Sequence, residues 1–444
     1  MSAATHHSDL QDMSTTERQK EARRVVMSSY LGSTIEFYDF LLYTAAAALV
    51  FPQVFFADMT PLAGTIASYL TFAAGYVARP IGGMIFGHFG DRLGRKKMLV
   101  LSMFVMGGAS TLIGLIPGSA TIGMAGAFIL LTLRLLQGIA IGGEWGGAAL
   151  MALEHASPKS RGFAASFVNA GAPSGAALGT FVLGLFASMP EEQFFSWGWR
   201  IPFLASALLL AVGLIIRLKI SESPIFEAAV ERDEAAEKPR DIPILSVIKR
   251  PKNLLLVMFG GAAGFALQTL LATFTVAYAV AHGAERQSVL YAFACASVLS
   301  IGMVILAGKV SDRIGRRPLM LLGMALFMAF AYPLFALMRT GDTLLIFVGF
   351  TVALLCHSTI YGPLAAFISE QFGTAARYTG ASVGYQMATL LGAGFTPTIL
   401  AAIYGGDGKI GPVVIYLIVL TAISGLAVLL TKESKDIDLE TYEH

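Results

Sequence analysis

Charged residues and cysteines are scarce in this sequence. Charged residues make up only 14% of the 444 positions, against roughly 25% in an ordinary soluble domain. Hydrophobic residues make up 55%, which is too much apolar material for one soluble core. The two cysteines, Cys295 and Cys356, both lie inside apolar runs. A disulfide framework is therefore excluded, and a metal site built on cysteine is not expected.

The motifs of nucleotide chemistry and hydrolysis are missing as well. The sequence has no Gly-Lys-Ser/Thr phosphate loop, no Ser-His-Asp arrangement and no cluster of His and Asp metal ligands. The net charge is +2, and the basic residues gather in loops rather than on a helix with interleaved aromatic residues. We therefore predict neither an enzyme, nor a bound cofactor, nor a nucleic-acid partner.

Long apolar runs dominate what is present. A helix that crosses a bilayer needs about 20 predominantly apolar residues, and the sequence offers twelve such runs. An all-α membrane protein with twelve transmembrane helices is the predicted fold class. The predicted spans are 25–51, 62–86, 98–116, 122–152, 162–188, 199–219, 252–280, 288–308, 318–338, 343–369, 377–404 and 411–431.

The distribution of Lys and Arg predicts the orientation of these spans. Most of the 31 basic residues fall in segments on the same side as the N-terminus, and the opposite side holds only Arg200, Arg286, Arg339 and Lys409. Because Lys and Arg accumulate in cytoplasmic loops, both ends of the chain are predicted to be cytoplasmic. The predicted divisions are an N-terminal tail 1–24, a six-helix bundle 25–220, a linker 221–250, a second six-helix bundle 251–432 and a C-terminal tail 433–444.

A repeated peptide shows that the two halves are related. Gly87-His88-Phe89-Gly90-Asp91-Arg92-Leu93-Gly94-Arg95 follows the second span, and Gly308-Lys309-Val310-Ser311-Asp312-Arg313-Ile314-Gly315-Arg316 follows the eighth. A second match supports the repeat, since Glu154 precedes Arg161 as Glu370 precedes Arg377. Two related halves of six spans each are typical of a membrane transporter.

With these motifs the chain resembles the major facilitator superfamily and, within it, the bacterial metabolite:proton symporter family. The closest resemblance is to shikimate-type and related small-carboxylate members. The stretches that carry it are Ile35-Glu36-Phe37-Tyr38-Asp39-Phe40, Ala78-Arg79-Pro80-Ile81-Gly82-Gly83, Gly142-Gly143-Glu144-Trp145-Gly146-Gly147, Trp197-Gly198-Trp199-Arg200 and Arg377-Tyr378-Thr379-Gly380. The resemblance implies two pseudo-symmetric bundles around a central cavity that opens alternately to each side of the membrane.

The first span carries the clearest candidate for proton coupling. At helical spacing, Glu36, Asp39 and Tyr43 share one stripe, and both acids lie near the middle of the membrane. A charged carboxylate at that depth is costly unless it is paired or neutralised. The hypothesis is that Arg134, at similar depth in the fourth span, pairs with Glu36 or Asp39 and that a proton or the substrate loosens the pair. A permanent structural ion pair is the alternative.

Arg79 is the candidate for binding an anionic substrate. A guanidinium holds a carboxylate through two hydrogen bonds and keeps its charge. The alternative is a structural arginine that pairs with Glu144, which lies at similar depth. Glu144 itself is a candidate for proton relay or for balancing the charge of Arg79.

Other polar residues inside spans are candidates for lining the cavity. Interhelical hydrogen bonding is an equally good interpretation for each of them. They are Gln137, Asn169, His357, Tyr361, Tyr385 and Gln386.

The repeated peptides are predicted to form a gate at the cytoplasmic face. The resemblance places Asp91 against the start of the eleventh helix, at Arg377, where the positive end of the helix would attract a carboxylate. The predicted gate residues are Gly87, Asp91, Arg92, Arg95, Gly308, Asp312, Arg313, Arg316 and Arg377.

The prediction from sequence is a transporter that imports a small organic acid together with a proton across a bacterial inner membrane. Its partners are expected to be a small carboxylate and the bilayer, and it is expected to work as a monomer with the proton as coupling ion. A proton-driven exporter or a uniporter is the alternative within transport. A membrane sensor that does not transport is a third possibility.

Overall fold

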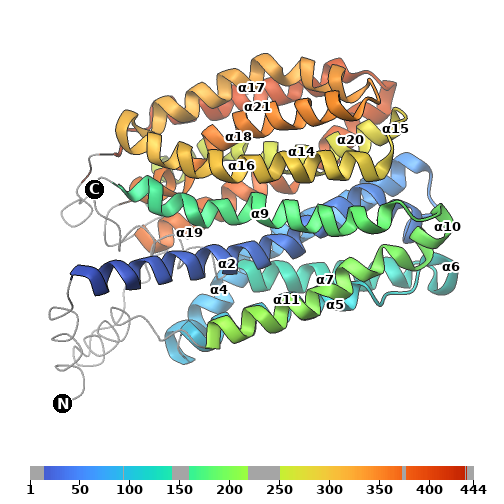
Figure 1. Ribbon diagram of the computed structural model, residues 1–444, viewed down its shortest axis with the longest axis horizontal. Coiled ribbons are helices and arrows are strands. Elements are labelled where there is room, and N and C mark those ends of the chain that lie inside the picture. The colour runs from blue at the N-terminus through green and yellow to red at the C-terminus, as the bar shows by residue number, and fades with distance from the viewer. Residues whose placement is uncertain are drawn as a thin grey trace.

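The computed structural model is a bundle of long helices that run side by side (Figure 1). It describes residues 15–93, 95–142, 160–218, 251–372, 377–435 and 437, and within these ranges the side chains of 87–97 and of Arg377 are among those left undescribed. The predicted linker 221–250 and residues 1–14 lie outside the described residues. In the described part, the predicted all-α fold is confirmed.

Helices of the first half occupy the lower part of Figure 1. They are α2 (Thr15–Leu49), α3 (Phe51–Val54), α4 (Pro61–Leu93), α5 (Arg95–Ile113), α6 (Ser119–Ile122), α7 (Ala125–Gly142), α9 (Arg161–Ala187), α10 (Glu191–Gln193), the π-helix η2 (Phe194–Gly198) and α11 (Arg200–Leu218).

Most helices of the second half lie above them, whereas α19 (Arg377–Thr389) reaches down to the level of α2 and α9 in Figure 1. They are α14 (Pro251–Ala272), α15 (Phe274–Ala281), α16 (Arg286–Ile314), α17 (Arg316–Met338), α18 (Thr343–Glu370), α19 (Arg377–Thr389), the π-helix η4 (Leu390–Gly394), α20 (Thr396–Asp407) and α21 (Ile410–Leu430).

Each predicted span coincides with a helix or with consecutive helices, although three differ in detail. The first helix begins at Thr15 rather than at residue 25. The seventh span is broken at Thr273, whose backbone angles leave the helical region. The eleventh contains the π-helical turn η4. The fourth is described only as far as Gly142, so its predicted extension to residue 152 lies outside the described residues.

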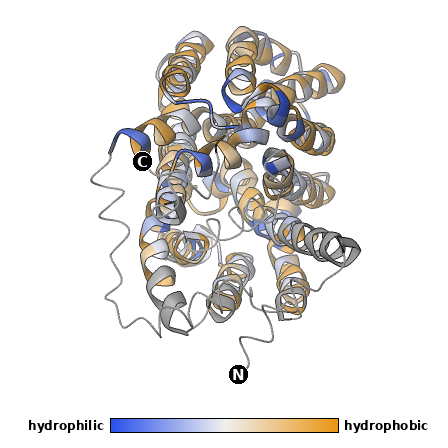
Figure 2. Cartoon of the chain, turned by 90° about the vertical axis from the view of Figure 1, so that its left-hand side faces the viewer, coloured by the Kyte–Doolittle hydropathy of each residue, from blue (hydrophilic) through white to orange (hydrophobic). Residues whose placement is uncertain are grey.

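The outer surface of the bundle is apolar. By length and composition, nine helices of the described ranges are able to cross a membrane, with the shorter apolar helix Val100–Ile113 beside them. Phe128, Leu208 and Ile415 are 65%, 69% and 63% exposed on this surface, which would be a liability in water but suits a lipid environment. Viewed along the helices, Figure 2 shows hydrophobic residues spread around the bundle.

The two halves meet along an antiparallel pair of helices, α9 and α16. Near one end, a Cβ placed on Gly162 would lie 2.7 Å from the carbonyl oxygen of Gly308. Near the other, a Cβ on Gly184 would lie 2.6 Å from the ring of Tyr291. We call the first the motif end, because α16 finishes there in the repeated peptide, and the second the opposite end. Small residues let the two backbones approach closely along this seam.

Glycine also determines how α7 packs against α4. A Cβ on Gly138 would lie 2.1 Å from the carbonyl oxygen of Gly75, and one on Gly142 would lie 1.9 Å from that of Arg79. Without side chains at these positions the two helices come into direct backbone contact. This contact places the helix that carries Arg134 against the helix that carries Arg79.

We expect Gly138→Ala to destabilise the protein by about 1–3 kcal/mol, the usual cost of overpacking a well-packed interior. The new methyl group would collide with backbone, which cannot move aside as a flexible side chain does. The measurement is thermal unfolding of the purified protein in detergent. Gly108→Ala on α5 is the matched control, because a Cβ there meets nothing within 4 Å. Equal unfolding temperatures for the two variants would contradict this account.

Candidate functional site

Two arginines from neighbouring helices lie buried against the same aromatic ring. The guanidinium carbon of Arg79 on α4 is 4.8 Å from the centre of the Phe40 ring, and that of Arg134 on α7 is 4.6 Å from it. Arg79 is 5% exposed and Arg134 is 1% exposed. The structure therefore brings together the two cations that the sequence analysis selected, with Phe40 of α2 in contact with both.

Further aromatic rings surround both cations. Arg79 also lies 4.2 Å from the ring centre of Tyr76, and Arg134 lies 4.1 Å from that of Tyr43 and 5.1 Å from that of Phe72. The negative faces of such rings attract cations, and more strongly where water is excluded. These contacts offset part of the cost of burying two positive charges.

Several donor atoms of the two guanidiniums remain without a hydrogen-bond partner in the described chain. They are Nε of Arg79 and Nε and Nη2 of Arg134. Only Nη1 of Arg134 donates, to Oε1 of Gln137 at 3.1 Å. Buried donors without acceptors are unusual and costly, and these three nitrogens suit the oxygens of an anionic ligand.

Asp39 lies in the same half, at 3% exposure, but it is held by hydroxyl groups. The hydroxyl of Ser206 on α11 donates to its carboxylate, and Ser110 on α5 is a second hydroxyl neighbour. Within the described residues, Arg134 forms no direct ion pair with Asp39 or Glu36, contrary to the hypothesis from sequence. The side chain of Gln137 stands next to Arg134 instead, and its Nε2 donates to Ser110 Oγ at 2.7 Å.

The second half contributes a group of aromatic and polar residues. His357 stacks on Tyr361, with ring centres 4.9 Å apart, and its Nε2 lies 3.0 Å from the carbonyl oxygen of Gly264. Phe265 lies edge-on to both Tyr361 and Tyr385. Glu36 on α2 is half-buried and lies within electrostatic reach of these two tyrosines.

Two predicted amide residues lie between the halves. Asn169 on α9 donates to the carbonyl oxygen of Tyr361 at 2.7 Å, and Gln386 on α19 donates to that of Gly142 at 3.3 Å. Both bonds use backbone acceptors, so in this conformation the two side chains serve as interhelical contacts. Tyr43, a further predicted residue, shares a hydrogen bond of 2.7 Å with Thr71.

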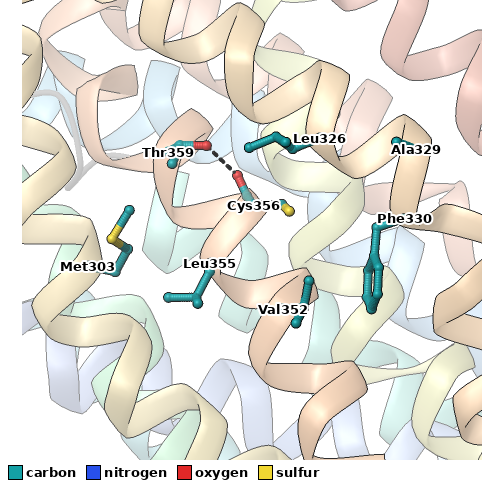
Figure 3. Close-up of a pocket in the computed structure, with 8 residues that line it drawn as sticks. All are labelled: Met303, Leu326, Ala329, Phe330, Val352, Leu355, Cys356 and Thr359. Carbon is teal, nitrogen blue, oxygen red and sulfur yellow. Dashed lines mark hydrogen bonds between the residues drawn. The ribbon is translucent and has the colours of Figure 1, made fainter.

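An apolar groove lies elsewhere on the protein. Its volume is about 460 Å³, and it is formed by α16, α17 and α18 (Figure 3). Leu326 and Leu355 at its rim are 47% and 37% exposed, which places it on the outer surface of the bundle. Its only hydroxyl, on Thr359, donates to the carbonyl oxygen of Cys356. The groove offers nothing to an anion and is separate from the arginine cluster.

At the motif end, Asp312 connects the halves. Its Oδ1 accepts the backbone N–H of Gly162 at 2.8 Å and its Oδ2 accepts that of Phe163 at 2.9 Å. These are groups of the first turn of α9, where the helix dipole favours negative charge. A carboxylate of the second half thereby caps a helix of the first.

A buried ion network holds Asp312 in place. Arg316 donates to Asp312 at 2.7 Å and makes two bonds to Glu370, at 3.0 and 3.2 Å. Ser434 donates to Glu370 at 2.6 Å, and Arg161 of the first half donates to the carbonyl oxygen of Ile437 at 2.7 Å. The end of the chain thus takes part in the same network. Arg313 is exposed beside it.

The opposite end is joined by weaker contacts. Arg286 lies 3.8 Å from Glu191, whose side chain is 75% exposed, and exposed ion pairs contribute little. The ring of Tyr291 stacks on that of Phe181, with centres 5.5 Å apart. The two ends therefore differ in the kind of contact that closes them.

Some predicted residues cannot be placed. Glu144 lies outside the described residues, and so do the side chains of the first repeated peptide and of Arg377. The described backbone of the first repeated peptide is helical, since α4 extends through Gly87, Asp91 and Arg92 and α5 begins at Arg95.

The sequence analysis missed several participants. Tyr76 precedes Arg79 by three positions on the same helix, a spacing that would have revealed this aromatic contact. Phe72 contacts Arg134 of a different helix, which spacing along the chain does not reveal. Ser110 and Ser206 had no such signal, since a serine in an apolar run is usually bonded to its own helix. Glu370 was noticed only as part of the repeat.

Comparison with known proteins agrees with this geometry. The sequence profile of the Major Facilitator Superfamily matches the chain over residues 31–382 and 263–441. The chain belongs to the major facilitator superfamily. The predicted resemblance to this superfamily and its metabolite transporters is thereby confirmed.

Similar superfamily members are bacterial transport proteins. The chain is 40% identical to the inner membrane metabolite transport protein YhjE of Escherichia coli (strain K12), with 93% of this chain and 94% of that protein covered. It is 38% identical to the shikimate transporter of the same organism, with 93% and 95% covered. This chain is therefore a multi-pass membrane transporter of metabolites and not an enzyme.

A solved structure of the same superfamily shares the fold. The proton:xylose symporter XylE bound to 6-bromo-6-deoxy-D-glucose superimposes with a TM-score of 0.73, covering 95% of this chain and 98% of that one. The sequence identity is 16%, so the likeness extends to the fold alone.

We expect Asp312→Asn to loosen the motif end, because it removes the charge that binds the first turn of α9 and Arg316. Hydrogen bonds to charged groups contribute about 1.5–3 kcal/mol each. The measurement is maleimide labelling of Ser166→Cys, a buried α9 position beside Gly308, in a background without Cys295 and Cys356. Labelling should become several-fold faster.

Asp342→Asn is the control for this experiment. Asp342 also caps a helix, accepting the N–H of Leu345, but it does so on its own helix α18. Labelling that is equally fast in both variants would show that Asp312 does not hold the halves together.

Proposed function

We propose that this protein imports a small organic acid together with a proton across a bacterial inner membrane. The observation that carries the proposal is the pair Arg79 and Arg134, with three buried nitrogens that lack acceptors in the described chain. A carboxylate accepts hydrogen bonds from a guanidinium in a planar, paired geometry. A carboxylate substrate therefore supplies both the charge and the acceptor atoms that the two arginines need.

The shikimate transporter at 38% identity supports the choice of acid. Shikimate-type acids combine one carboxylate with a small ring that carries hydroxyl groups. Phe40 and Tyr76, whose rings lie against Arg79, offer apolar ring edges for such a ring. Tyr361 and Tyr385 from the second half offer hydroxyl groups for the ring hydroxyls of such an acid.

Asp39 and Glu36 are the proposed proton carriers. Both belong to α2, which also supplies Phe40 in contact with the two arginines. A proton that neutralises a carboxylate here lowers the cost of a negative charge nearby and so favours binding of the acid. The loaded protein then opens at the motif end, which the positive-inside pattern assigns to the cytoplasm.

The remaining parts of the proposal follow from the same cycle. The proton is the coupling ion, and no other cofactor is required. Both chain termini lie in the cytoplasm. All proposed substrate contacts come from one chain, so a monomer suffices.

We expect substrate-dependent alkalinisation outside proteoliposomes when shikimate is added as probe. Arg79→Gln and Arg134→Gln should each weaken shikimate binding at least about tenfold, because truncating one partner of a buried charge pair costs 2 kcal/mol or more. Asp39→Asn should abolish the pH change. Binding is measured by thermal shift, and proton movement by an external pH dye.

Arg286→Gln serves as the charge control, since Arg286 lies at the opposite end against exposed Glu191. Shikimate uptake without any pH change would indicate a uniporter. External alkalinisation during shikimate export would indicate an exchanger, because a proton then enters as the acid leaves. Binding without flux would favour a sensor.

A further inference from the structure

A chain of hydrogen bonds runs from the buried arginine to the buried acid. Arg134 Nη1 donates to Gln137 Oε1, and Gln137 Nε2 donates to Ser110 Oγ. Ser110 in turn neighbours the carboxylate of Asp39. Three helices contribute to this chain: α7 supplies the first two residues, α5 the third and α2 the acid.

The direction of donation is the same at every step. A guanidinium can only donate hydrogen bonds. The amide of Gln137 accepts one at its oxygen and donates the next from its nitrogen. Ser110 accepts the amide N–H, so its own proton is left for the acceptor on its other side. An ionised carboxylate can only accept. The chain is therefore complete when Asp39 is charged.

A proton on Asp39 conflicts with this order. The neutral carboxyl group acquires an O–H donor, and a proton on the oxygen that faces Ser110 gives the Ser110 hydroxyl donors on both sides. Its hydroxyl has to turn, and the bond to Gln137 changes with it. Because Gln137 accepts from Nη1, the one nitrogen of Arg134 with a partner among the described residues, the change reaches the proposed anion site without contact between the two charges.

Few other charged groups face Asp39. The hydroxyl of Ser206 on α11 donates to it, and on α2 itself the hydroxyl of Tyr38 is committed to the carbonyl oxygen of Pro202. Glu36 lies one turn earlier on α2. The neighbouring helix α9 presents glycines to this part of α2, as at Gly175. From α4, Arg79 lies against the Phe40 ring.

We propose that Ser110 and Gln137 are positioning residues that couple the protonation of Asp39 to the anion site at Arg134. This inference rests on the proposed function for its meaning in transport. The coupling itself is a property of the protein without substrate. Its role is distinct from that of a direct ion pair, since the two charges influence each other through a neutral amide and a hydroxyl.

The decisive experiment is a double-mutant cycle on the full-length, substrate-free protein. Infrared difference spectroscopy follows the carboxyl band of Asp39, identified by its loss in Asp39→Asn, as the pH is varied. In the otherwise native protein, Arg134→Gln should move the midpoint of this titration by about one pH unit, a tenfold change in proton affinity. In a Ser110→Ala or Gln137→Met background the same substitution should move it by less than a third of that.

Thr111→Val is the matched control on α5. Its hydroxyl donates to the carbonyl oxygen of Gly107 in its own helix and takes no part in the chain. Arg134→Gln should act in this background as it does in the native protein. An equal effect of Arg134→Gln with and without Ser110 would overturn the inference, as would a titration that does not respond to Arg134 at all.

A parallel measurement separates this inference from the proposed function. Shikimate binding by the same variants is compared at low and at neutral pH. If the native protein binds no shikimate while the cycle shows coupling, the proposed substrate is wrong and the coupling stands. If shikimate binds and its pH dependence survives in Ser110→Ala and Gln137→Met, proton coupling takes another route and the inference fails.

Discussion

The burial of two guanidinium groups in one half of a membrane protein constrains everything around them. Charges inside the membrane are costly and need compensation. Arg79 and Arg134 obtain it from the faces of aromatic rings, with Phe40 shared between them. Glycine on α4 also makes room for the Arg134 side chain. A Cβ on Gly75 would lie 2.7 Å from Nε of Arg134. Compensation remains incomplete within the described residues, where three guanidinium nitrogens lack acceptors, and these donors are the basis of the proposed anion site.

The two ends of the bundle are closed by different contacts, so opening them costs different amounts of free energy. At the motif end, the buried carboxylate of Asp312 has to leave the first turn of α9, and Arg161 has to leave the carbonyl oxygen of Ile437. Buried ionic groups are expensive to leave without partners. At the opposite end, an exposed ion pair and ring contacts are what join the halves within the described residues. An empty transporter would therefore open more readily at the opposite end, and in the proposed cycle substrate and proton would compensate for breaking the motif end.

Features that depend on neighbouring residues in the chain could be predicted from the sequence, whereas features that depend on how distant helices pack could not. Span positions and the repeated peptides are local properties, so the twelve helices and the importance of Asp312 could be predicted from composition and spacing. Arg79 and Arg134 could be selected from the sequence because a charge inside an apolar span is costly and is usually retained for function. The partners of Asp39 could not be predicted, since which serine reaches a carboxylate depends on how three helices pack. The expected direct pair with Arg134 was wrong for the same reason.

Separation of Asp39 from Arg134 also has an energetic consequence. A direct pair at 4 Å would interact by about 4 kcal/mol at an effective dielectric constant of 20, and that interaction would have to be lost and regained in each cycle. Reversing a two-state population from 1:99 to 99:1 takes only about 5.5 kcal/mol, so one such pair would consume most of the available difference. The Coulomb term falls as the charges move apart, and the intervening Gln137 and Ser110 keep a directional link at lower cost. A relay of neutral groups thus lets the acid sense the anion site while leaving Arg134 free to bind substrate.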